Sequence, residues 1–240
     1  MAADRGLTRR LTALTGFVAG IALIGALLVG AVAYKAADMD FYAAEYAKYG
    51  NAAALGMSGP DLLAATAQLL SYLRGEAPDM NIRAVIAGRT QEMFNEREKT
   101  HMVDVRLLYG HMLRAGAAGA ALGLLGAGLL VWRRGWRRGA AAWGRGYLKA
   151  LAAAAGVFLV LVAVITRDFT AFWTNFHGVF FTNDLWLLDP ETDRMIVMFP
   201  EGFFFDLVEE ILRLWTICAG GAGVLAGGAA LFFRKDGLVK

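Results

Sequence analysis

Histidine, the residue best suited to move protons near neutral pH, occurs three times in the 240 residues of this chain, as His101, His111 and His177. His101 and Asp104 are three positions apart in a segment that we expect to be helical, so their side chains share a face. A carboxylate at that spacing orients an imidazole and raises its basicity. His177 lies inside an aromatic run, where partial desolvation favours the neutral imidazole that a general base needs. The sequence therefore offers two candidate proton-transfer sites.

The remaining chemical groups argue against several common kinds of site. Ten residues, about 15 Å of helix, separate His101 from His111, which is too far for one metal ion. The single cysteine, Cys218, forms neither an internal disulfide nor a zinc site. The chain contains no Gly-x-Ser-x-Gly elbow, His-Glu-x-x-His pair or phosphate loop. We expect no metal and no cofactor, and a nucleophile, if there is catalysis, that comes from the substrate.

These residues alone leave catalysis as one of several interpretations. A single His-x-x-Asp pair is a weak motif, and a histidine beside a membrane span is commonly an interfacial anchor. The same residues fit an enzyme and an accessory membrane protein without activity.

The elements that must position these residues are mainly membrane helices. The chain is 58% hydrophobic and only 19% charged, and a span needs about 20 mostly apolar residues. Four stretches qualify, so we predict an all-α integral membrane protein that forms one integral domain, residues 1–240. The predicted spans are about 11–33, 105–132, 147–165 and 207–233, and residues 34–104 and 167–206 form an outer cap.

Charge is distributed unevenly around these spans. Residues 133–149 contain six basic side chains and no acidic one, whereas residues 168–210 contain nine carboxylates and only Arg194 as a cation. By the positive-inside rule, both termini are cytoplasmic and the cap is extracytoplasmic. The termini agree with this orientation, since they carry the basic residues Arg5, Arg9, Arg10, Arg234, Lys235 and Lys240. Because the positive charge lies in short clusters beside spans, we expect no nucleic-acid binding.

The cap is predicted to contain helices and a short β-hairpin. Tyrosines within 42–49 and leucines within 62–73 recur at helical spacing, and a third helix at about 83–99 leads into the second span. The apolar runs 185–189 and 195–199 flank a Pro-Glu-Thr-Asp turn, which predicts the hairpin. In the spans, the pairs Gly16–Gly20, Gly119–Gly123 and Gly223–Gly227 are each one turn apart and predict close helix packing.

Two segments of the chain resemble a known protein family. The run Arg97-Glu98-Lys99-Thr100-His101-Met102-Val103-Asp104-Val105 is similar to the Arg-Glu-x-x-His-Met-x-Asp-Val signature of the lipoprotein intramolecular transacylases, a family of four-span bacterial membrane proteins. The segment from Phe176-His177 to Asp206, with Trp186-x-Leu188-Asp189-Pro190, resembles the second signature of that family. With the span order and the basic loop, the resemblance covers nearly the whole chain.

The resemblance implies an acyl transfer in the bacterial cytoplasmic membrane, without a cofactor. The substrate would be a diacylated lipoprotein, whose sn-2 acyl chain moves to the α-amino group of its amino-terminal cysteine and leaves a lyso-form. His101 and His177 would be catalytic, and we favour His101 as the base because Asp104 can hold its tautomer. Asp104 and Arg97 would be orienting residues, and Trp186 would line the substrate site.

The resemblance also implies an active site on the extracytoplasmic side, at the level of the membrane lipid. We expect a monomer. Two alternatives stay open: a lipid-ester hydrolase that uses the same histidines to activate water, and a non-enzymatic accessory protein that would tolerate the loss of both histidines.

Overall fold

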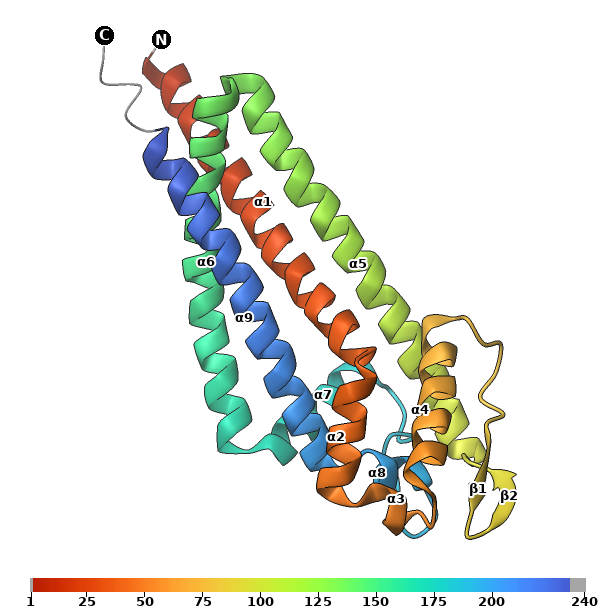
Figure 1. Cartoon of the computed structure of the whole chain (residues 1–240). Helices are drawn as coiled ribbons and strands as arrows, with labels where there is room; N and C mark the ends of the chain where they lie inside the picture. Colours follow the sequence, from red (N-terminus) through yellow and green to blue (C-terminus); the bar gives the residue numbers. More distant parts are fainter. Residues whose placement is uncertain (1, 234–240) are drawn as a thin grey trace. The chain divides into compact units, whose positions relative to one another are not determined.

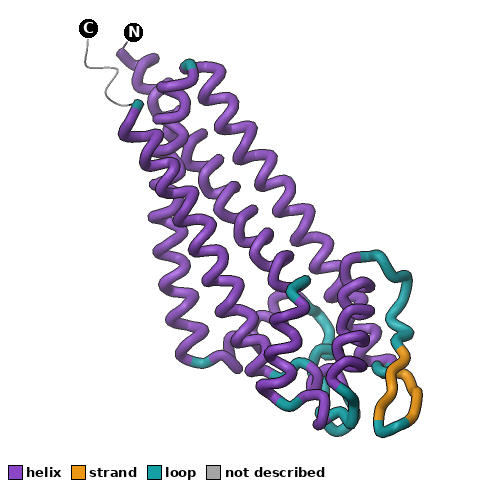
Figure 2. Tube along the Cα trace, viewed as in Figure 1, coloured by secondary structure: helices purple, strands orange, loops and turns teal. Residues whose placement is uncertain are grey.

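The computed structural model describes residues 2–233, and the side chains of residues 6–233. The predicted basic tail with Arg234, Lys235 and Lys240 lies outside the described residues, as does the side chain of Arg5. Among residues 2–233 helix predominates, and the strands are confined to one two-stranded hairpin (Figure 2).

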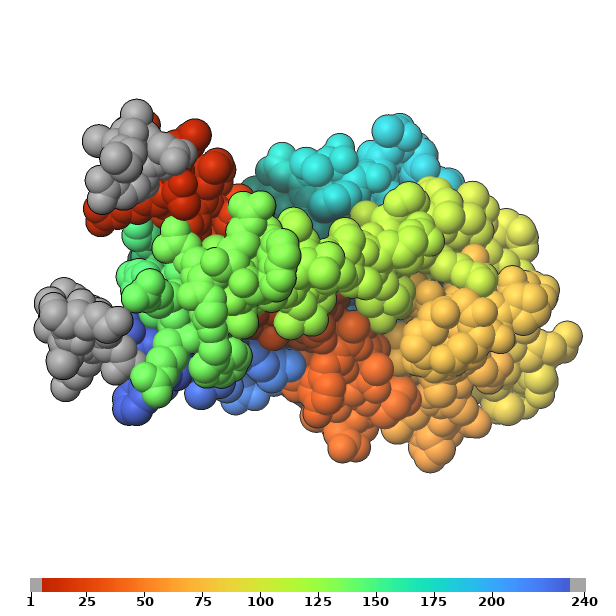
Figure 3. Space-filling model, turned by 90° about the horizontal axis from the view of Figure 1, so that it is seen from above, coloured from red at the N-terminus to blue at the C-terminus, as the bar shows by residue number. Residues whose placement is uncertain are grey.

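Four helices of the described chain are long and apolar enough to cross a membrane, which confirms the predicted number of spans. Each of them covers one predicted span to within a residue and extends beyond it. They are α1 (Ala2–Ala36), α5 (Glu96–Arg134), α6 (Trp136–Arg167) and α9 (Glu201–Phe232), labelled in Figure 1. Leu124 and Leu125 of α5 are 67% and 72% exposed, as suits side chains in contact with lipid, and much of the α5 surface is uncovered in Figure 3 (green).

The chain divides into two compact units, and the first consists of helix segments 2–31, 114–166 and 211–233. Its helices pack through glycine. A Cβ added at Gly20 would lie 2.9 Å from the Tyr147 Cα atom, and one added at Gly123 would lie 3.2 Å from the Ala19 carbonyl oxygen. The predicted close packing is confirmed for the first two glycine pairs, whereas in the third pair only Gly223 has a close neighbour.

The second unit, residues 32–113 and 167–210, contains the shorter elements. Its core is built from buried aromatic, leucine and methionine side chains, with Leu62, Met93 and Met198 fully buried. The predicted helices at 42–49 and 62–73 are present as α2 (Met39–Tyr49) and α4 (Gly59–Arg74). The elements are α2 (Met39–Tyr49), α3 (Asn51–Ala54), α4 (Gly59–Arg74), β1 (Arg83–Ile86), β2 (Arg89–Glu92), α7 (Phe169–Phe180) and α8 (Arg194–Met198).

The predicted third cap helix at 83–99 was wrong over most of its length. Residues 83–92 form an antiparallel hairpin in which Val85 faces Thr90. The turn residues Ala87 and Gly88 have φ values of 51° and 75°, which a helix does not allow. The side chains of β1 alternate between exposed and buried, the period of a strand that covers a core on one face.

The hairpin predicted around Pro190 is absent from the described chain. The Asp189 carbonyl oxygen accepts hydrogen bonds from the Thr192 and Asp193 amides at 3.0 and 2.7 Å, so the chain makes a compact turn and then enters α8. The predicted class, an all-α membrane protein with a helical cap and one short hairpin, is confirmed, with the hairpin at 83–92. The assignment of the whole chain to one integral domain stays a prediction.

Candidate active site

His101 lies in the second turn of α5, and a reciprocal cap fixes the start of that helix. The Asn95 amide donates to Glu98 Oε2 at 2.7 Å, while the Glu98 amide donates to Asn95 Oδ1 at 3.0 Å. This is the capping-box arrangement. Glu98 is only 1% exposed, and its other oxygen accepts a hydrogen bond from the Met195 amide at 2.5 Å. The beginning of α5 is thereby tied to the start of α8.

The same cap holds the turn that precedes α8. Asn95 Nδ2 donates to Asp193 Oδ1 at 2.6 Å, and Asp193 Oδ2 accepts from the Asp189 amide at 2.7 Å. The Arg194 guanidinium donates to the Glu92 carbonyl at 2.7 Å. Buried polar groups of this kind are costly unless paired, so the network permits few alternative positions for the turn.

His177 lies in the last turn of α7. The side chain of Asp168 caps the start of that helix by accepting a hydrogen bond from the Ala171 amide at 2.9 Å. At the other end, Nδ1 of His177 lies 2.7 Å from the Trp173 carbonyl oxygen. A carbonyl oxygen only accepts, so Nδ1 carries the proton. In the neutral ring Nε2 then holds the free lone pair.

The two imidazoles meet inside an aromatic enclosure. Their ring centroids are 6.3 Å apart, and both residues are buried, at 7% and 8% exposure. Phe181 borders both rings, with its centroid 5.2 Å from that of His101 and 5.7 Å from that of His177. Trp186 stacks on His177 at 4.8 Å, and Trp173 meets the same ring edge-on at 4.8 Å. The two candidate residues from distant parts of the sequence therefore form one site.

Arg97 and Asp104 flank His101 on the same face of α5 and hold the loop that follows α7. The Arg97 guanidinium donates to the Asp184 carbonyl oxygen. Asp104 Oδ2 accepts a hydrogen bond from Asn183 Nδ2 at 2.9 Å. The Asn183 carbonyl in turn accepts from the Trp186 indole nitrogen at 2.9 Å. Through this chain of contacts α5 positions the Trp186 ring against His177.

The expected hydrogen bond between His101 and Asp104 is not present. The carboxylate of Asp104 is engaged by Asn183, and Nδ1 of His101 is buried without a hydrogen-bond partner in the described chain. A shared helix face brought the two residues near each other, but the loop residue competes for the carboxylate. Asp104 therefore acts on the loop and not on the tautomer of His101.

Burial sets the charge state of His177. It lowers the pKa of the imidazole, while the hydrogen bond to the Trp173 carbonyl opposes this effect and raises it. The net shift is downward from the ordinary value of about 6.5. At neutral pH His177 is therefore uncharged and presents a basic Nε2.

Several residues of the site were missed in the sequence. Asn183 carries no signal by type, because its importance comes from the loop conformation, whereas Phe181 belongs to the aromatic run around His177. The cap formed by Asn95 and Glu98 does have a signal, the Asn-x-x-Glu spacing before a helix. His111 is exposed and has no described contact with the two buried imidazoles. Within residues 2–233, no group of three or more His, Cys, Asp or Glu residues could hold a metal ion.

Comparison with known proteins agrees with this architecture. The family model described as "Lipoprotein intramolecular transacylase Lit" matches residues 17–204. No curated protein sequence matches the chain. Among solved structures, the lipoprotein intramolecular transacylase Lit from Bacillus cereus is 20% identical, with a TM-score of 0.71 over 98% of this chain and 100% of that one.

Two further structures of the Bacillus cereus protein, each with one histidine replaced, are similar as well. The variant with arginine is 18% identical, with a TM-score of 0.67 over 98% of this chain and 96% of that one. The variant with alanine is 18% identical, with a TM-score of 0.68 over 100% of this chain and 99% of that one. At these identities the structures show a shared fold.

Proposed function

We propose, from the premise that the chain belongs to the lipoprotein intramolecular transacylase Lit family, that His101 and His177 carry out the acyl transfer between them. The substrate is a diacylglyceryl-modified lipoprotein. Its sn-2 acyl chain moves to the α-amino group of the amino-terminal cysteine. The observation that carries this proposal is the pair of buried imidazoles with ring centroids 6.3 Å apart.

His177 is the general base of this proposal, in place of the His101 assignment that the sequence favoured. Its Nδ1–H is engaged by the Trp173 carbonyl, so Nε2 is the free acceptor. Its lowered pKa keeps this acceptor unprotonated at neutral pH. The α-amino group of the substrate has a pKa of about 8, so its nucleophilic neutral form arises at neutral pH by loss of a proton to water, and the base is needed for the second proton, which the nitrogen releases when it attacks.

His101 complements this base as a hydrogen-bond donor. Nδ1 of His101 is buried without a partner, and an orphaned N–H is less readily tolerated than an orphaned acceptor. The favoured neutral tautomer therefore carries its proton on Nε2. That N–H can stabilise the oxyanion that forms when the amine attacks the ester carbonyl. One imidazole accepts and the other donates.

The reaction balances without any further reagent. The amine nitrogen forms a bond to the ester carbonyl carbon, and His177 takes up the proton that the nitrogen releases. The tetrahedral intermediate then breaks its bond to the glyceryl oxygen, which receives that proton as the leaving alkoxide. The products are an amide on the cysteine and a free sn-2 hydroxyl. Because amine and ester belong to one molecule, holding them together contributes much of the acceleration.

Arg97, Asp104 and Trp186 are positioning or substrate-lining residues in this proposal. Arg97 and Asp104 hold the loop at Asn183 and Asp184. Trp186 is partly exposed and stacks on the base. It limits the positions of the His177 ring and offers an apolar face to the glyceryl or acyl part of the substrate.

The chain is membrane-integral, and we place it in the bacterial cytoplasmic membrane with both termini in the cytoplasm. Six basic residues at 133–149 against nine carboxylates at 168–210 support this orientation. The histidine pair then faces the extracytoplasmic side, where lipidated lipoproteins carry their amino terminus. We expect the protein to act as a monomer.

The test is to express the chain in a bacterium that makes diacylated lipoproteins and to locate the acyl chains on a reporter peptide by tandem mass spectrometry. We expect one acyl chain on the cysteine nitrogen and a lyso-glyceryl group. The variants His101→Ala and His177→Ala should both lack this product while remaining in the membrane. Release of free fatty acid without N-acylation would identify a hydrolase, and full activity in either variant would exclude the mechanism.

A further inference from the structure

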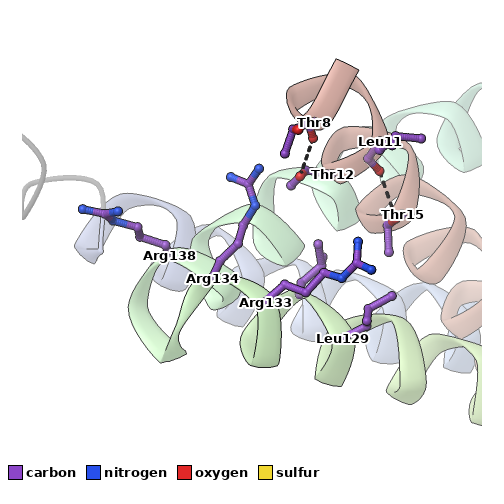
Figure 4. Close-up of a pocket in the computed structure, with 9 residues that line it drawn as sticks. Thr8, Leu11, Thr12, Thr15, Leu129, Arg133, Arg134 and Arg138 are labelled. Atoms are coloured by element: carbon purple, nitrogen blue, oxygen red, sulfur yellow. Dashed lines mark hydrogen bonds between the residues drawn. The ribbon is translucent and has the colours of Figure 1, made fainter. Parts of the chain in front are cut away.

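A second polar site lies in the first unit, among residues that the acyl transfer does not use. It is a cavity of about 510 Å³ between the beginning of α1, the end of α5 and the beginning of α6 (Figure 4). The lining combines three arginines with threonines and leucines. The lining residues are Thr8, Leu11, Thr12, Thr15, Leu129, Leu130, Arg133, Arg134 and Arg138.

The cavity lies next to a close contact between α1 and α5. A Cβ added at Gly126 would lie 2.7 Å from the Ala19 Cβ atom, so the two helices touch there. The lining residues of α5 begin just beyond this point, at Leu129. Gly135, with a φ of 74°, then turns the chain into α6 and brings Arg138 to the same cavity.

The lining is cationic and has no internal counter-charge. None of the nine lining residues is acidic. Arg133, Arg134 and Arg138 form no ion pair or hydrogen bond with any other residue that the structure describes. Figure 4 shows the side chains of Arg133 and Arg134 extending from α5 toward the α1 turns that carry Thr12 and Thr15, whereas the Arg138 side chain extends away from them. Two unpaired guanidinium groups directed at one space favour an anion there.

The hydrogen-bond donors that remain free in the cavity favour a phosphate-like group among the possible anions. The hydroxyls of Thr12 and Thr15 donate to the carbonyls of Thr8 and Leu11, at 2.8 and 2.9 Å. The free donors of the cavity are therefore mainly guanidinium N–H groups. Their planar fork matches the oxygen spacing of a phosphate and binds it in a bidentate way.

The apolar part of the lining indicates that this phosphate belongs to a lipid. Leu11 and Leu129 line the cavity and are also 52% and 40% exposed on the helix surface. Trp132 and Trp136, beside the arginines in sequence, are 79% and 68% exposed. Exposed tryptophans beside arginines are typical of the interface between a bilayer and water. A free phosphate would gain nothing from the leucines, whereas an acyl chain would.

We propose that this cavity binds the phosphate headgroup of an anionic phospholipid from the leaflet next to the turn between α5 and α6. Arg133 and Arg134 hold the bound headgroup, and its acyl chains lie along Leu11 and Leu129. Basic pockets between membrane helices bind lipid headgroups by the same chemistry. The site is separate from the histidine pair, so the proposal does not depend on the reaction assigned to it.

The test uses the full chain in detergent, with phosphatidylglycerol, phosphatidylcholine and inorganic phosphate as separate probes. Binding is counted by native mass spectrometry, and the melting temperature is followed by tryptophan fluorescence. The test variant is Arg133→Gln/Arg134→Gln, and the control is Arg145→Gln/Lys149→Gln. The control removes the same charge from two exposed positions of α6 that do not line the cavity. A third variant, Thr12→Phe, fills the cavity and keeps its charge.

We expect phosphatidylglycerol to bind and to raise the melting temperature of the wild type and the control. Binding should weaken about tenfold or more in Arg133→Gln/Arg134→Gln, because each lost charged hydrogen bond costs roughly that factor. Thr12→Phe should weaken it as well. Equal binding in the test and control variants would overturn the proposal, and so would equal binding of phosphatidylcholine. Displacement of phosphatidylglycerol by an equal concentration of inorganic phosphate would overturn the assignment to a lipid.

Discussion

The two halves of α5 make different kinds of contact: the first half uses hydrogen-bonding side chains, and the second half uses glycines. Residues 96–113 belong to the unit with the histidine pair, and this half makes side-chain hydrogen bonds through Arg97, Glu98 and Asp104. Residues 114–134 belong to the other unit, where Gly119, Gly123 and Gly126 bring the helix against α1. The first half makes hydrogen bonds to specific partners through polar side chains. The second half contacts α1 at glycines, which have no side chain and let the two backbones approach closely.

The difference shows that a membrane enzyme can use separate sets of residues to orient its catalytic side chains and to pack its membrane helices. In an apolar surrounding, contact between helices comes from close packing of small residues, which fixes distance but recognises no particular chemistry. A catalytic pair needs orientation to within a fraction of an ångström, and buried hydrogen-bond networks supply it. Changes in the two halves should therefore fail in different ways.

The largest effect is expected in the glycine half. Gly126→Leu places a bulky side chain where even a Cβ lies 2.7 Å from Ala19, and we expect a loss of about 3 kcal/mol or of the fold itself. Gly128→Leu is the matched control, because nothing lies within 4 Å of its Cβ position. The measurement is the melting temperature in detergent by size-exclusion chromatography after heating. Equal melting temperatures for the two variants would show that the glycines do not set the packing.

In the polar half, Asp104→Ala should reduce kcat/KM by about 10–100-fold, the effect typical of lost supporting contacts around a site. It removes the acceptor for Asn183 and frees the loop that carries Trp186. Asp104→Asn keeps an oxygen that can accept this bond, so it should retain most of the activity while losing the charge. Equal activity of the two variants, both low, would instead assign the effect to the negative charge near His101.

The pH dependence tests the burial of the histidine pair. Because the pKa of His177 is lowered in the folded protein, its neutral form persists below pH 6.5. The acid break in kcat/KM that belongs to His177 should therefore lie below pH 6.5, where it adds about a further tenfold loss per pH unit to the tenfold loss that the substrate amine already causes below pH 8. It is distinct from the break near pH 8 that the substrate amine contributes. A His177-dependent break at or above pH 6.5 would contradict the neutral base.

The smallest effect is expected from an exposed ion pair of the polar half. Lys99 Nζ contacts Glu92 and Glu96 at 2.9 and 3.0 Å, but these carboxylates are 54% and 88% exposed. Lys99→Ala should therefore change the stability by about 0.5 kcal/mol and leave activity unchanged. Thermal unfolding at low and high salt measures this. A loss of activity comparable to that of Asp104→Ala would mean that polar contacts in this half matter regardless of burial.

The sequence predicted the spans well because their signal is strong. About 20 consecutive apolar residues have few other interpretations, and α1, α5, α6 and α9 each covered a predicted span. The sequence analysis predicted the hairpin in the wrong segment. Residues 83–92 have only a short alternating pattern, whereas the sequence around Pro190 is typical of a hairpin turn. There, the buried carboxylate of Asp193 stabilises a compact turn through the Asp189 amide.

The sequence predicted which residues form the candidate site, but not the hydrogen bonds that hold them in place. The types and spacing of His101, Arg97 and Asp104 placed them on one helix face, and the aromatic run singled out His177. No local pattern could show that Asp104 bonds to Asn183 across 79 positions, or that Trp173 fixes the tautomer of His177. Those contacts depend on the loop conformation, which arises from tertiary packing.

The central claim is that His177 accepts the proton and His101 donates a hydrogen bond. It is tested most directly by N-acylation rates of His177→Asn and His101→Gln on a diacylated reporter peptide. Asparagine keeps a donor for the Trp173 carbonyl but has no basic nitrogen, so His177→Asn should lose about 10²–10⁴-fold. Glutamine keeps an N–H near the position of Nε2, so His101→Gln should retain measurable activity. The opposite pattern, an active His177→Asn with an inactive His101→Gln, would contradict the account.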